Sequence, residues 1–390
     1  MPVISLRSLA ADRAFAAVKD FYFHSRYGER RSDPDIADFT FGNPHEMPLQ
    51  GLVAAIRDAA VPANKDWFAY KTSEEAARNF LAATVSRELA LPFEPDDFAL
   101  TAGAFAAISV AFRLLLDAGD EAVYSEPAWF CYEPMLLGAD AVVRKVALKG
   151  PRFELDVDAI EAALGPRTRL VIVNTPHNPT GRIYGRDVLA ALAERLDRAS
   201  ARFGRRIFLL SDEPYRRLRL DGRGFVSPAA VYPCTLISYS YGKVLLAPGQ
   251  RLGYLALSPL MPAAERQALR GAMFATQMAL GWCFPNAVMQ NAVPQLEHLS
   301  IDVQALTRRR DRLTAVLRQA GHLVLPPEGT FYLWVKWSDK ADPQRQWEAL
   351  ADRGVFVMPG SIMNAPDYFR ISLTASDAMV ERALPVFAQV

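Results

Sequence analysis

The chain of 390 residues has almost no net charge. Its 44 lysine and arginine residues balance its 43 aspartate and glutamate residues, which leaves a formal net charge of +1. A broad basic surface, the usual electrostatic footprint of nucleic-acid or anionic-membrane binding, is therefore not indicated. We expect small-molecule ligands, with no nucleic acid and no membrane as partner.

Cysteine and histidine are scarce. The three cysteines, Cys131, Cys234 and Cys283, are odd in number and far apart, so they indicate neither a disulfide framework nor a CxxC metal site. The five histidines do not fall in the spacing of metal ligands. We interpret His177 as packing within its loop, and we expect no bound metal.

Long apolar runs and nucleotide-binding motifs are also missing. No apolar segment approaches the roughly 20 residues of a membrane span, and the first residues lack the apolar core of a secretory signal. We therefore expect a cytoplasmic protein. Neither GxGxxG nor GxxxxGK followed by Ser or Thr occurs, which makes a nucleotide-binding enzyme the weakest alternative.

Short β-branched runs alternate with helical patterns between about residue 49 and residue 258. Seven runs are typical of strands, and several are continuously apolar, as in strands covered on both faces: residues 97–103, 121–127, 141–148, 169–176, 205–214, 235–240 and 251–258. Helical patterns occur at 104–119, 156–165 and 186–204. This alternation predicts an α/β fold, with a large domain whose mostly parallel seven-stranded sheet is wrapped by helices.

The pattern changes from about Met261 onward. A long helical pattern at 302–321 precedes predicted strands at 330–337, 354–359 and 368–374 and a last helix near 376–390. We expect a smaller α+β domain, built from the C-terminal third and the N-terminal segment. The predicted boundaries are 1–48 for the N-terminal segment, 49–280 for the large domain and 281–390 for the small domain.

Three polar residues follow successive predicted strands: Asn178 in VNTPHNPTG, Asp212 in LLSDEPY and Lys243 in SYSYGK. Each separation is close to the length of one strand, helix and return strand, so we expect all three at one edge of the sheet. An amide, a carboxylate and an amine would share a crevice there. A lysine among small neighbours is easily desolvated, and a desolvated amine is a nucleophile toward carbonyl groups.

The segment TAGAFAAI predicts an anion site. A strand ends there in a glycine turn that opens into a helix, so the backbone N–H groups of Gly103, Ala104 and Phe105 would face a phosphate. Simple packing of the turn is an equal alternative. Ser240 and Arg251, on either side of Lys243, would add a hydroxyl donor and a fixed positive charge.

These motifs together resemble a known family. The chain is similar, over nearly its whole length, to the fold type I, class I/II aminotransferases of the aspartate aminotransferase-like superfamily, which depend on pyridoxal 5′-phosphate (PLP). NPTG at 178–181 and DEPY at 212–215 occur in the order and spacing of that family. The family's lysine signature is matched by Ser240, Lys243, Gly249, Arg251 and Gly253.

The resemblance implies a homodimer with active sites at the subunit interface. Such an enzyme transfers an amino group between an L-amino acid and a 2-oxo acid in a two-step ping-pong cycle. Lys243 would form a Schiff base with the PLP aldehyde and afterwards move a proton. Asp212 would keep the pyridine nitrogen protonated, so that the ring acts as an electron sink. A helix cap is the alternative role for Asp212.

The resemblance also implies roles for residues around the cofactor ring. Asn178 and Tyr215 would donate hydrogen bonds to the phenolic oxygen, and Trp129 would stack on the ring, unless it is a core tryptophan. Tyr70 resembles the tyrosine that reaches the partner's cofactor phosphate. The glycine that usually precedes the following helix is missing, so Phe68 is an alternative to Tyr70.

For the substrate, the resemblance implies that Arg370 clamps the α-carboxylate through paired hydrogen bonds. A structural ion pair is the alternative. Gly42 would bring its backbone close to the same carboxylate, and Trp129 and Asn178 would also contact the substrate.

The sequence defines the substrate and the type of reaction less closely than it defines the cofactor. Phe105 stands where some relatives that prefer acidic substrates have a lysine, which argues against aspartate. Apolar residues at 21–23, 331–332 and 361–364 could instead form a pocket for aromatic or aliphatic amino acids. The cofactor motifs do not separate transamination from a PLP-dependent lyase or oxidase reaction. A non-catalytic amino-acid-sensing module is a further alternative, although no DNA-binding segment is apparent.

Overall fold

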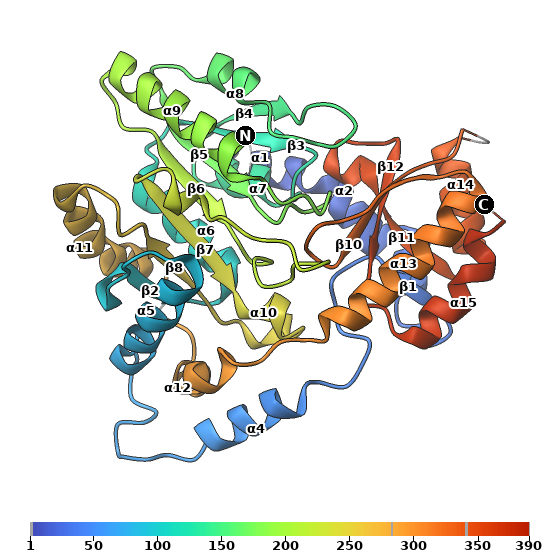
Figure 1. Cartoon of the computed structure of the whole chain (residues 1–390), viewed down its shortest axis with the longest axis horizontal. Coiled ribbons are helices and arrows are strands. Elements are labelled where there is room, and N and C mark those ends of the chain that lie inside the picture. The colour runs from blue at the N-terminus through green and yellow to red at the C-terminus, as the bar shows by residue number, and fades with distance from the viewer. Residues whose placement is uncertain (1–2, 282–283, 340–341, 390) are drawn as a thin grey trace.

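The computed structural model describes residues 3–281, 284–339 and 342–389. The strands are β1 (Ala37–Phe39), β2 (Phe98–Thr101), β3 (Glu121–Glu126), β4 (Val142–Ala147), β5 (Thr168–Asn174), β6 (Phe208–Asp212), β7 (Thr235–Ser240), β8 (Gly253–Leu257), β9 (Leu323–Leu325), β10 (Tyr332–Lys336), β11 (Val355–Pro359) and β12 (Tyr368–Ser372). Figure 1 shows them in two sheets, the larger one toward the centre and left and the smaller one at the right.

The α-helices surround these sheets. They are α1 (Leu6–Ala14), α2 (Ala16–Lys19), α3 (Arg26–Arg30), α4 (Gln50–Ala59), α5 (Glu75–Leu89), α6 (Gly103–Leu115), α7 (Tyr132–Gly138), α8 (Val157–Ala163), α9 (Arg186–Phe203), α10 (Tyr241–Val244), α11 (Ala263–Ala279), α12 (Ala287–Leu296), α13 (Val303–Ala320), α14 (Pro343–Asp352) and α15 (Asp377–Phe387). A π-helical turn (Asp20–His24) and short 3-10 turns complete the assigned helices.

The larger sheet has the strand order β2-β8-β7-β6-β5-β3-β4 within the described residues. The neighbouring pairs from β7 to β4 are parallel, whereas β8 is antiparallel to both β7 and β2. Strands β5, β6 and β7 are almost entirely buried, as expected for parallel strands covered on both faces. The predicted mostly parallel seven-stranded sheet is confirmed.

The smaller sheet has the order β1-β11-β12-β10-β9 in the described part of the chain. β1 pairs in parallel with β11, with Ala37 opposite Val355, so the N-terminal segment completes this sheet as predicted. Helix α13 contacts α15 and β9, and α14 contacts β11. The fold class is therefore confirmed, while the boundaries at 48/49 and 280/281 stay a prediction.

Helix α1 was not predicted. It lies against α7 (Figure 1), and Arg7 in α1 pairs with Asp140 just after α7 at 3.0 Å. Phe15, the residue after α1, packs against Phe130, with the two ring centres 6.1 Å apart. The N-terminal helix therefore covers the loop that carries Trp129.

Within the described residues no helix is long and apolar enough to cross a membrane. The same residues contain no cluster of three metal-ligating side chains. Cys131 and Cys234 are free and buried, and Cys283 lies outside the described residues.

Candidate active site

The carboxyl ends of three adjacent parallel strands carry the first part of the site. Asn174 on β5 lies opposite Asp212 on β6, and Asp212 lies opposite Ser238 on β7. The Asp212 carboxylate accepts hydrogen bonds from Ser238 Oγ at 2.5 Å, from Tyr132 Oη at 2.5 Å and from Asn174 Nδ2 at 3.3 Å. The sheet thus holds Asp212 in one orientation at its edge, and a helix cap is not its role.

Burial raises the pKa of Asp212 above its usual range. The hydrogen bonds from Ser238 and Tyr132 and the positive charge of Lys243 act in the opposite direction. A cationic group brought against this carboxylate would stabilise its ionised form further, because an opposite charge nearby favours the charged state. The Asp212 environment therefore suits a cationic ligand atom.

Lys243 lies on the short helix α10, directly after β7. Ser240 caps this helix, and its Oγ accepts from Gly242 N at 3.3 Å. The Lys243 amine is half-buried, 5.8 Å from the centre of the Tyr215 ring and 5.9 Å from that of Phe331. The amine therefore faces aromatic rings near the Asp212 end of the sheet.

The start of α6 forms an anion cradle. No side chain caps the first N–H groups of this helix, and Gly103 has φ +80, which favours glycine. An added Cβ at Gly103 would lie 3.1 Å from Nη2 of Arg251. A Cβ at Gly253 would lie 2.2 Å from the Tyr239 carbonyl oxygen, so only glycine fits between these backbones.

Arg251 has no anionic partner among the described residues. Its Nη1 donates to the Pro248 carbonyl at 2.7 Å, and partial burial lowers its pKa. A guanidinium in this position is stabilised by an anion, and the uncapped N-terminus of α6 lies beside it. Arg251 and the N-terminus of α6 together suit a phosphate group.

Most of the predicted cofactor residues line one cavity of about 100 Å³. Its walls are formed by Ala104, Phe105, Ile108, Trp129, Asn174, Asn178, Asp212, Pro214, Tyr215, Ser240, Lys243 and Arg251. The Trp129 ring is half-buried and meets the Phe105 ring edge-on, with centroids 5.0 Å apart. The amine, the carboxylate and the anion cradle therefore open into a common space.

Arg370 reaches this region from β12 in the smaller sheet. It is 2% exposed, and its Nη1 and Nη2 donate to Asn178 Oδ1 and to the Thr40 carbonyl, both at 2.9 Å. Its Nε is buried without a hydrogen-bond partner, and no carboxylate of the described residues pairs with it. The alternative prediction, in which Arg370 forms a structural ion pair with a carboxylate of the protein, is therefore wrong within the described residues. The free donors suit a carboxylate ligand.

Gly42 and Tyr70 are not among the residues that line the cavity. An added Cβ at Gly42 would lie 2.6 Å from the Phe331 ring and 2.9 Å from the Tyr332 hydroxyl, so glycine leaves room for these two side chains. Tyr70 is fully exposed and Phe68 is 57% exposed. Neither contributes to the cavity of its own subunit.

The sequence interpretation missed Asn174 and Ser238, and it did not predict the hydrogen bond of Tyr132 to Asp212. It named Tyr332 only as part of a possible apolar pocket. Asn174 ends a predicted strand, as Asp212 does, and Ser238 precedes Ser240 by two residues on a strand, which places both on one face. These two carried a usable signal. Tyr132 and Tyr332 stand in aromatic segments, WFCY and TFY, where no spacing distinguishes a site residue from a core residue.

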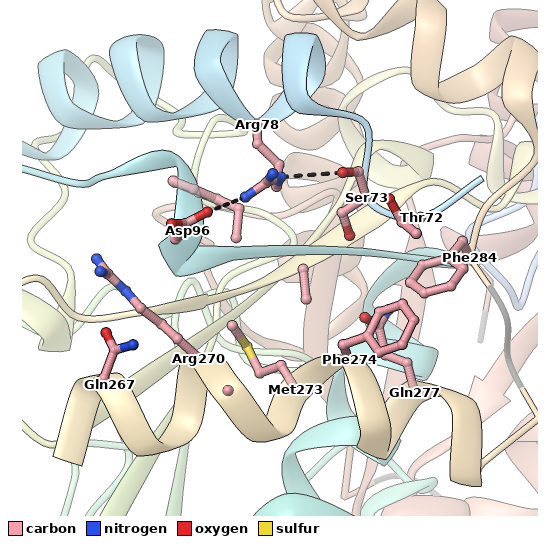
Figure 2. Close-up of a pocket in the computed structure, with 13 residues that line it drawn as sticks. Thr72, Ser73, Arg78, Asp96, Gln267, Arg270, Met273, Phe274, Gln277 and Phe284 are labelled. Carbon is pink, nitrogen blue, oxygen red and sulfur yellow. Dashed lines mark hydrogen bonds and ion pairs between the residues drawn. The ribbon is translucent and has the colours of Figure 1, made fainter. Parts of the chain in front are cut away.

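A larger cavity, of about 380 Å³, lies between α5, β2 and α11 and contains none of the predicted site residues (Figure 2). Two arginines line it, and both are already paired. Arg78 is bonded to Asp96, and Arg270 Nη2 donates to Asp97 at 2.8 Å. This cavity offers no free charged group for chemistry among its described residues.

The chain is similar to known proteins over most of its length. Residues 34–387 match the family model for aminotransferase class I and II. The aspartate/prephenate aminotransferase of Thermus thermophilus is 31% identical over 93% of this chain and 92% of its own length. The methionine aminotransferase of Escherichia coli is 30% identical over 70% of this chain and 69% of its own length.

Solved structures agree as well. An amino transferase from Eubacterium rectale superposes with a TM-score of 0.88 and 26% identity, covering 100% of this chain and 98% of the other. A mutant of Thermus thermophilus aspartate aminotransferase gives a TM-score of 0.82 and 28% identity, with both chains covered completely. The chain therefore belongs to the class I and II aminotransferases, and it is a PLP-dependent transaminating enzyme.

Proposed function

We propose that the cavity lined by Lys243 and Asp212, together with Arg370 bonded to Asn178 in its wall, is the active site of an L-amino acid:2-oxo acid aminotransferase that works by a ping-pong cycle. The observation that carries this proposal is the convergence of an amine, a buried carboxylate and an anion cradle on one cavity, with a buried guanidinium at its rim.

The residues fit PLP. The N-terminus of α6, Ser240 and Arg251 would hold the phosphate, and the buried Asp212 would hold the protonated pyridine nitrogen. Asn178 and Tyr215 would donate hydrogen bonds to the phenolic oxygen. When bound, PLP withdraws electrons from the α-carbon of the amino acid, which makes its proton removable.

Side chains of the protein carry out the remaining functions of the site. Lys243 would hold the cofactor through Nζ and, once the substrate amine has displaced it, its free amine would take and return the proton at that same atom. Arg370 binds the substrate carboxylate, while Asn178 and the Thr40 carbonyl hold the guanidinium in place. Trp129 and Phe105 exclude water from one wall of the cavity. Gly42 is proposed to bring its backbone to the same carboxylate.

We further propose a homodimer in which Tyr70 completes the partner's phosphate site. Tyr70 is fully exposed, and Val61 and Phe68 on the same segment are also exposed. Phe274, which lines the cavity of Figure 2, and Met278, also on α11, are each about half exposed. A second subunit on this face would cover apolar surface that is otherwise in water.

The reaction can be tested with a screen of amino donors against 2-oxoglutarate and pyruvate. We expect amino transfer, with one new amino acid formed per donor consumed. Ammonia or hydrogen peroxide as the main product would instead indicate a lyase or an oxidase, and ligand binding without turnover would indicate a sensing module. The same screen gives the donor preference of the enzyme.

The role of Lys243 can be tested with Lys243→Ala. We expect this variant to lose turnover and the borohydride-reducible link to PLP, because no other amine lines the cavity within the described residues. The control is Lys19→Ala, which removes an exposed amine paired only with Asp12. A Lys243→Ala protein that still forms the reducible link would contradict the proposal.

A further inference from the structure

Tyr332 contacts both Arg370, which is proposed to bind the substrate carboxylate, and Tyr215, which is proposed to contact PLP. It is the first residue of β10 and is 3% exposed, although the sequence suggested only an apolar pocket position for it. The Arg370 guanidinium carbon lies 3.9 Å from the centre of the Tyr332 ring, so the planar cation stacks on the ring face. The ring thereby limits how the guanidinium can rotate.

The hydroxyl of Tyr332 lies on the cofactor side of the site. Tyr215 forms a hydrogen bond with it, and the two ring centres are 5.9 Å apart. Phe331 supports this arrangement, because its ring meets the Tyr215 ring edge-on with centroids 5.4 Å apart. Tyr215 is the residue proposed to donate to the phenolic oxygen of PLP.

The charges around Tyr332 reinforce the contact. Burial raises the pKa of Tyr332, but the positive charges of Arg370 and Lys243 and the hydrogen bond with Tyr215 outweigh burial and hold its pKa below the usual range. A hydroxyl with a lowered pKa is a stronger hydrogen-bond donor, so Tyr332 donates to Tyr215 Oη and leaves the single O–H of Tyr215 for the phenolic oxygen of PLP. The state of Tyr215 therefore depends on Tyr332.

We propose that Tyr332 is a positioning residue that couples the carboxylate clamp to the cofactor side of the site. Its ring holds the Arg370 guanidinium in the plane that a carboxylate needs, and its hydroxyl sets the hydrogen-bonding strength of Tyr215. This inference rests on the proposed function, because it assigns Arg370 to the substrate carboxylate and Tyr215 to PLP.

Two variants separate the ring from the hydroxyl. Tyr332→Phe keeps the stacking surface and removes the hydroxyl, and Tyr332→Leu removes both. The matched control is Tyr368→Phe, since Tyr368 stacks on Trp334 in the same small sheet and does not line the proposed cavity. Two readouts on the holoenzyme are used: the dissociation constant of propionate, a carboxylate without an amine, and the pH midpoint of the visible absorption change.

We expect Tyr332→Phe to bind propionate within about threefold of the parent, because the ring still supports Arg370. Its absorption midpoint should rise by about half a pH unit or more, because Tyr215 becomes a weaker donor. Tyr332→Leu should in addition bind propionate about tenfold more weakly. Tyr368→Phe should match the parent in both measurements.

An unchanged midpoint in Tyr332→Phe, or parental propionate affinity in a folded Tyr332→Leu, would overturn the coupling. Failure of the proposed function is recognised separately. In that case the parent itself shows no visible band that changes with pH, or Arg370→Ala binds propionate as the parent does. Either of these results also overturns the inference on Tyr332.

Discussion

At the scale of single residues, the site is defined by buried polar groups that lack a partner. Arg370 is held by two acceptors and one ring, yet its Nε has no acceptor within the described residues. Burying a guanidinium without an anion is costly, so we expect an anionic ligand to pair with Arg370. The family resemblance implied the role of Arg370, which lies on a late strand, but the sequence could not show which donors remain free.

Arg370→Ala should weaken the binding of every carboxylate substrate by about 3 kcal/mol, because a buried, hydrogen-bonded charge partner is lost. Arg370→Lys should recover part of this loss, since it restores the charge and loses the paired geometry. Isothermal titration with a series of 2-oxo acids measures the effect. Arg312→Ala, which removes an exposed arginine paired with Glu381, is the control. Equal affinities of Arg370→Ala and the parent would show that the clamp lies elsewhere.

His177 gives a prediction for stability. It is buried beside Thr180, with Nδ1 2.8 Å from Oγ1, and burial lowers its pKa from 6.5 to about 3. The unfolded chain therefore takes up a proton before the folded protein does. The contribution of His177 to stability is complete above pH 6.5 and is lost as the pH falls toward 3.

His177→Asn should therefore lose less free energy of unfolding than the parent on acidification. Between about pH 7 and about pH 5 we expect the difference in that loss to be about 2 kcal/mol. Urea unfolding at the two pH values measures it. His24→Asn, at an exposed histidine, should retain the parental dependence on pH. The prediction fails if His177→Asn and the parent lose the same free energy.

At the scale of elements, the strands were predictable and several helices were not. Strands β2 to β8 coincide with the runs read from the sequence, apart from Thr168 at the start of β5. Most of these strands are buried, and buried strands are continuous apolar segments. Helix α1 has no buried residue, so it carries no apolar stripe that a sequence could reveal. Its position is decided by contacts with α7, such as the pair between Arg7 and Asp140.

The buried arginine Arg216 ties helix α5 to the larger sheet. Its side chain is fully buried, and it donates to Glu88 on α5 at 3.0 Å and to the Tyr254 hydroxyl on β8 at 2.6 Å. Glu213 lies 3.6 Å away and is also fully buried. Burial raises the pKa of Glu213 to about 7 even though Arg216 lowers it.

Arg216→Leu should lower the free energy of unfolding by about 3 to 5 kcal/mol, because the buried Glu213 carboxylate loses its cation and the more exposed Glu88 loses its partner. Adding Glu213→Gln should recover part of the loss, since it removes one unpaired charge. Arg198→Leu, at an exposed arginine paired with Glu161, should change stability by less than about 1 kcal/mol. Urea denaturation of the four proteins measures these differences. A double variant less stable than Arg216→Leu would contradict this account.

At the scale of the whole molecule, the site forms where the two sheets meet. Arg370 of the smaller sheet bonds Asn178 of the larger one, and the N–H groups of Glu328 and Gly329 donate to the Gly181 carbonyl. Sequence reasoning predicted the residues on each side, because they follow strands. It could not predict how they meet, because contacts between distant segments leave no local pattern. The homodimer and the cytoplasmic location stay predictions.

The proposed homodimer can be tested with hybrid dimers, in which the two subunits carry different substitutions. If Tyr70 acts on the partner's phosphate site, then mixing refolded Lys243→Ala and Tyr70→Ala subunits creates hybrids with one intact site, because each defect falls in the other site. Both defects then fall in the same site of the hybrid, and its other site keeps Lys243 and the partner's Tyr70. We expect activity to rise to about a quarter of the parental value at equal mixing, well above either variant alone at limiting PLP. Mixing Lys243→Ala with Phe68→Ala tests the alternative residue in the same way. If Tyr70 serves its own subunit, both sites of the hybrid are defective and mixing yields no gain.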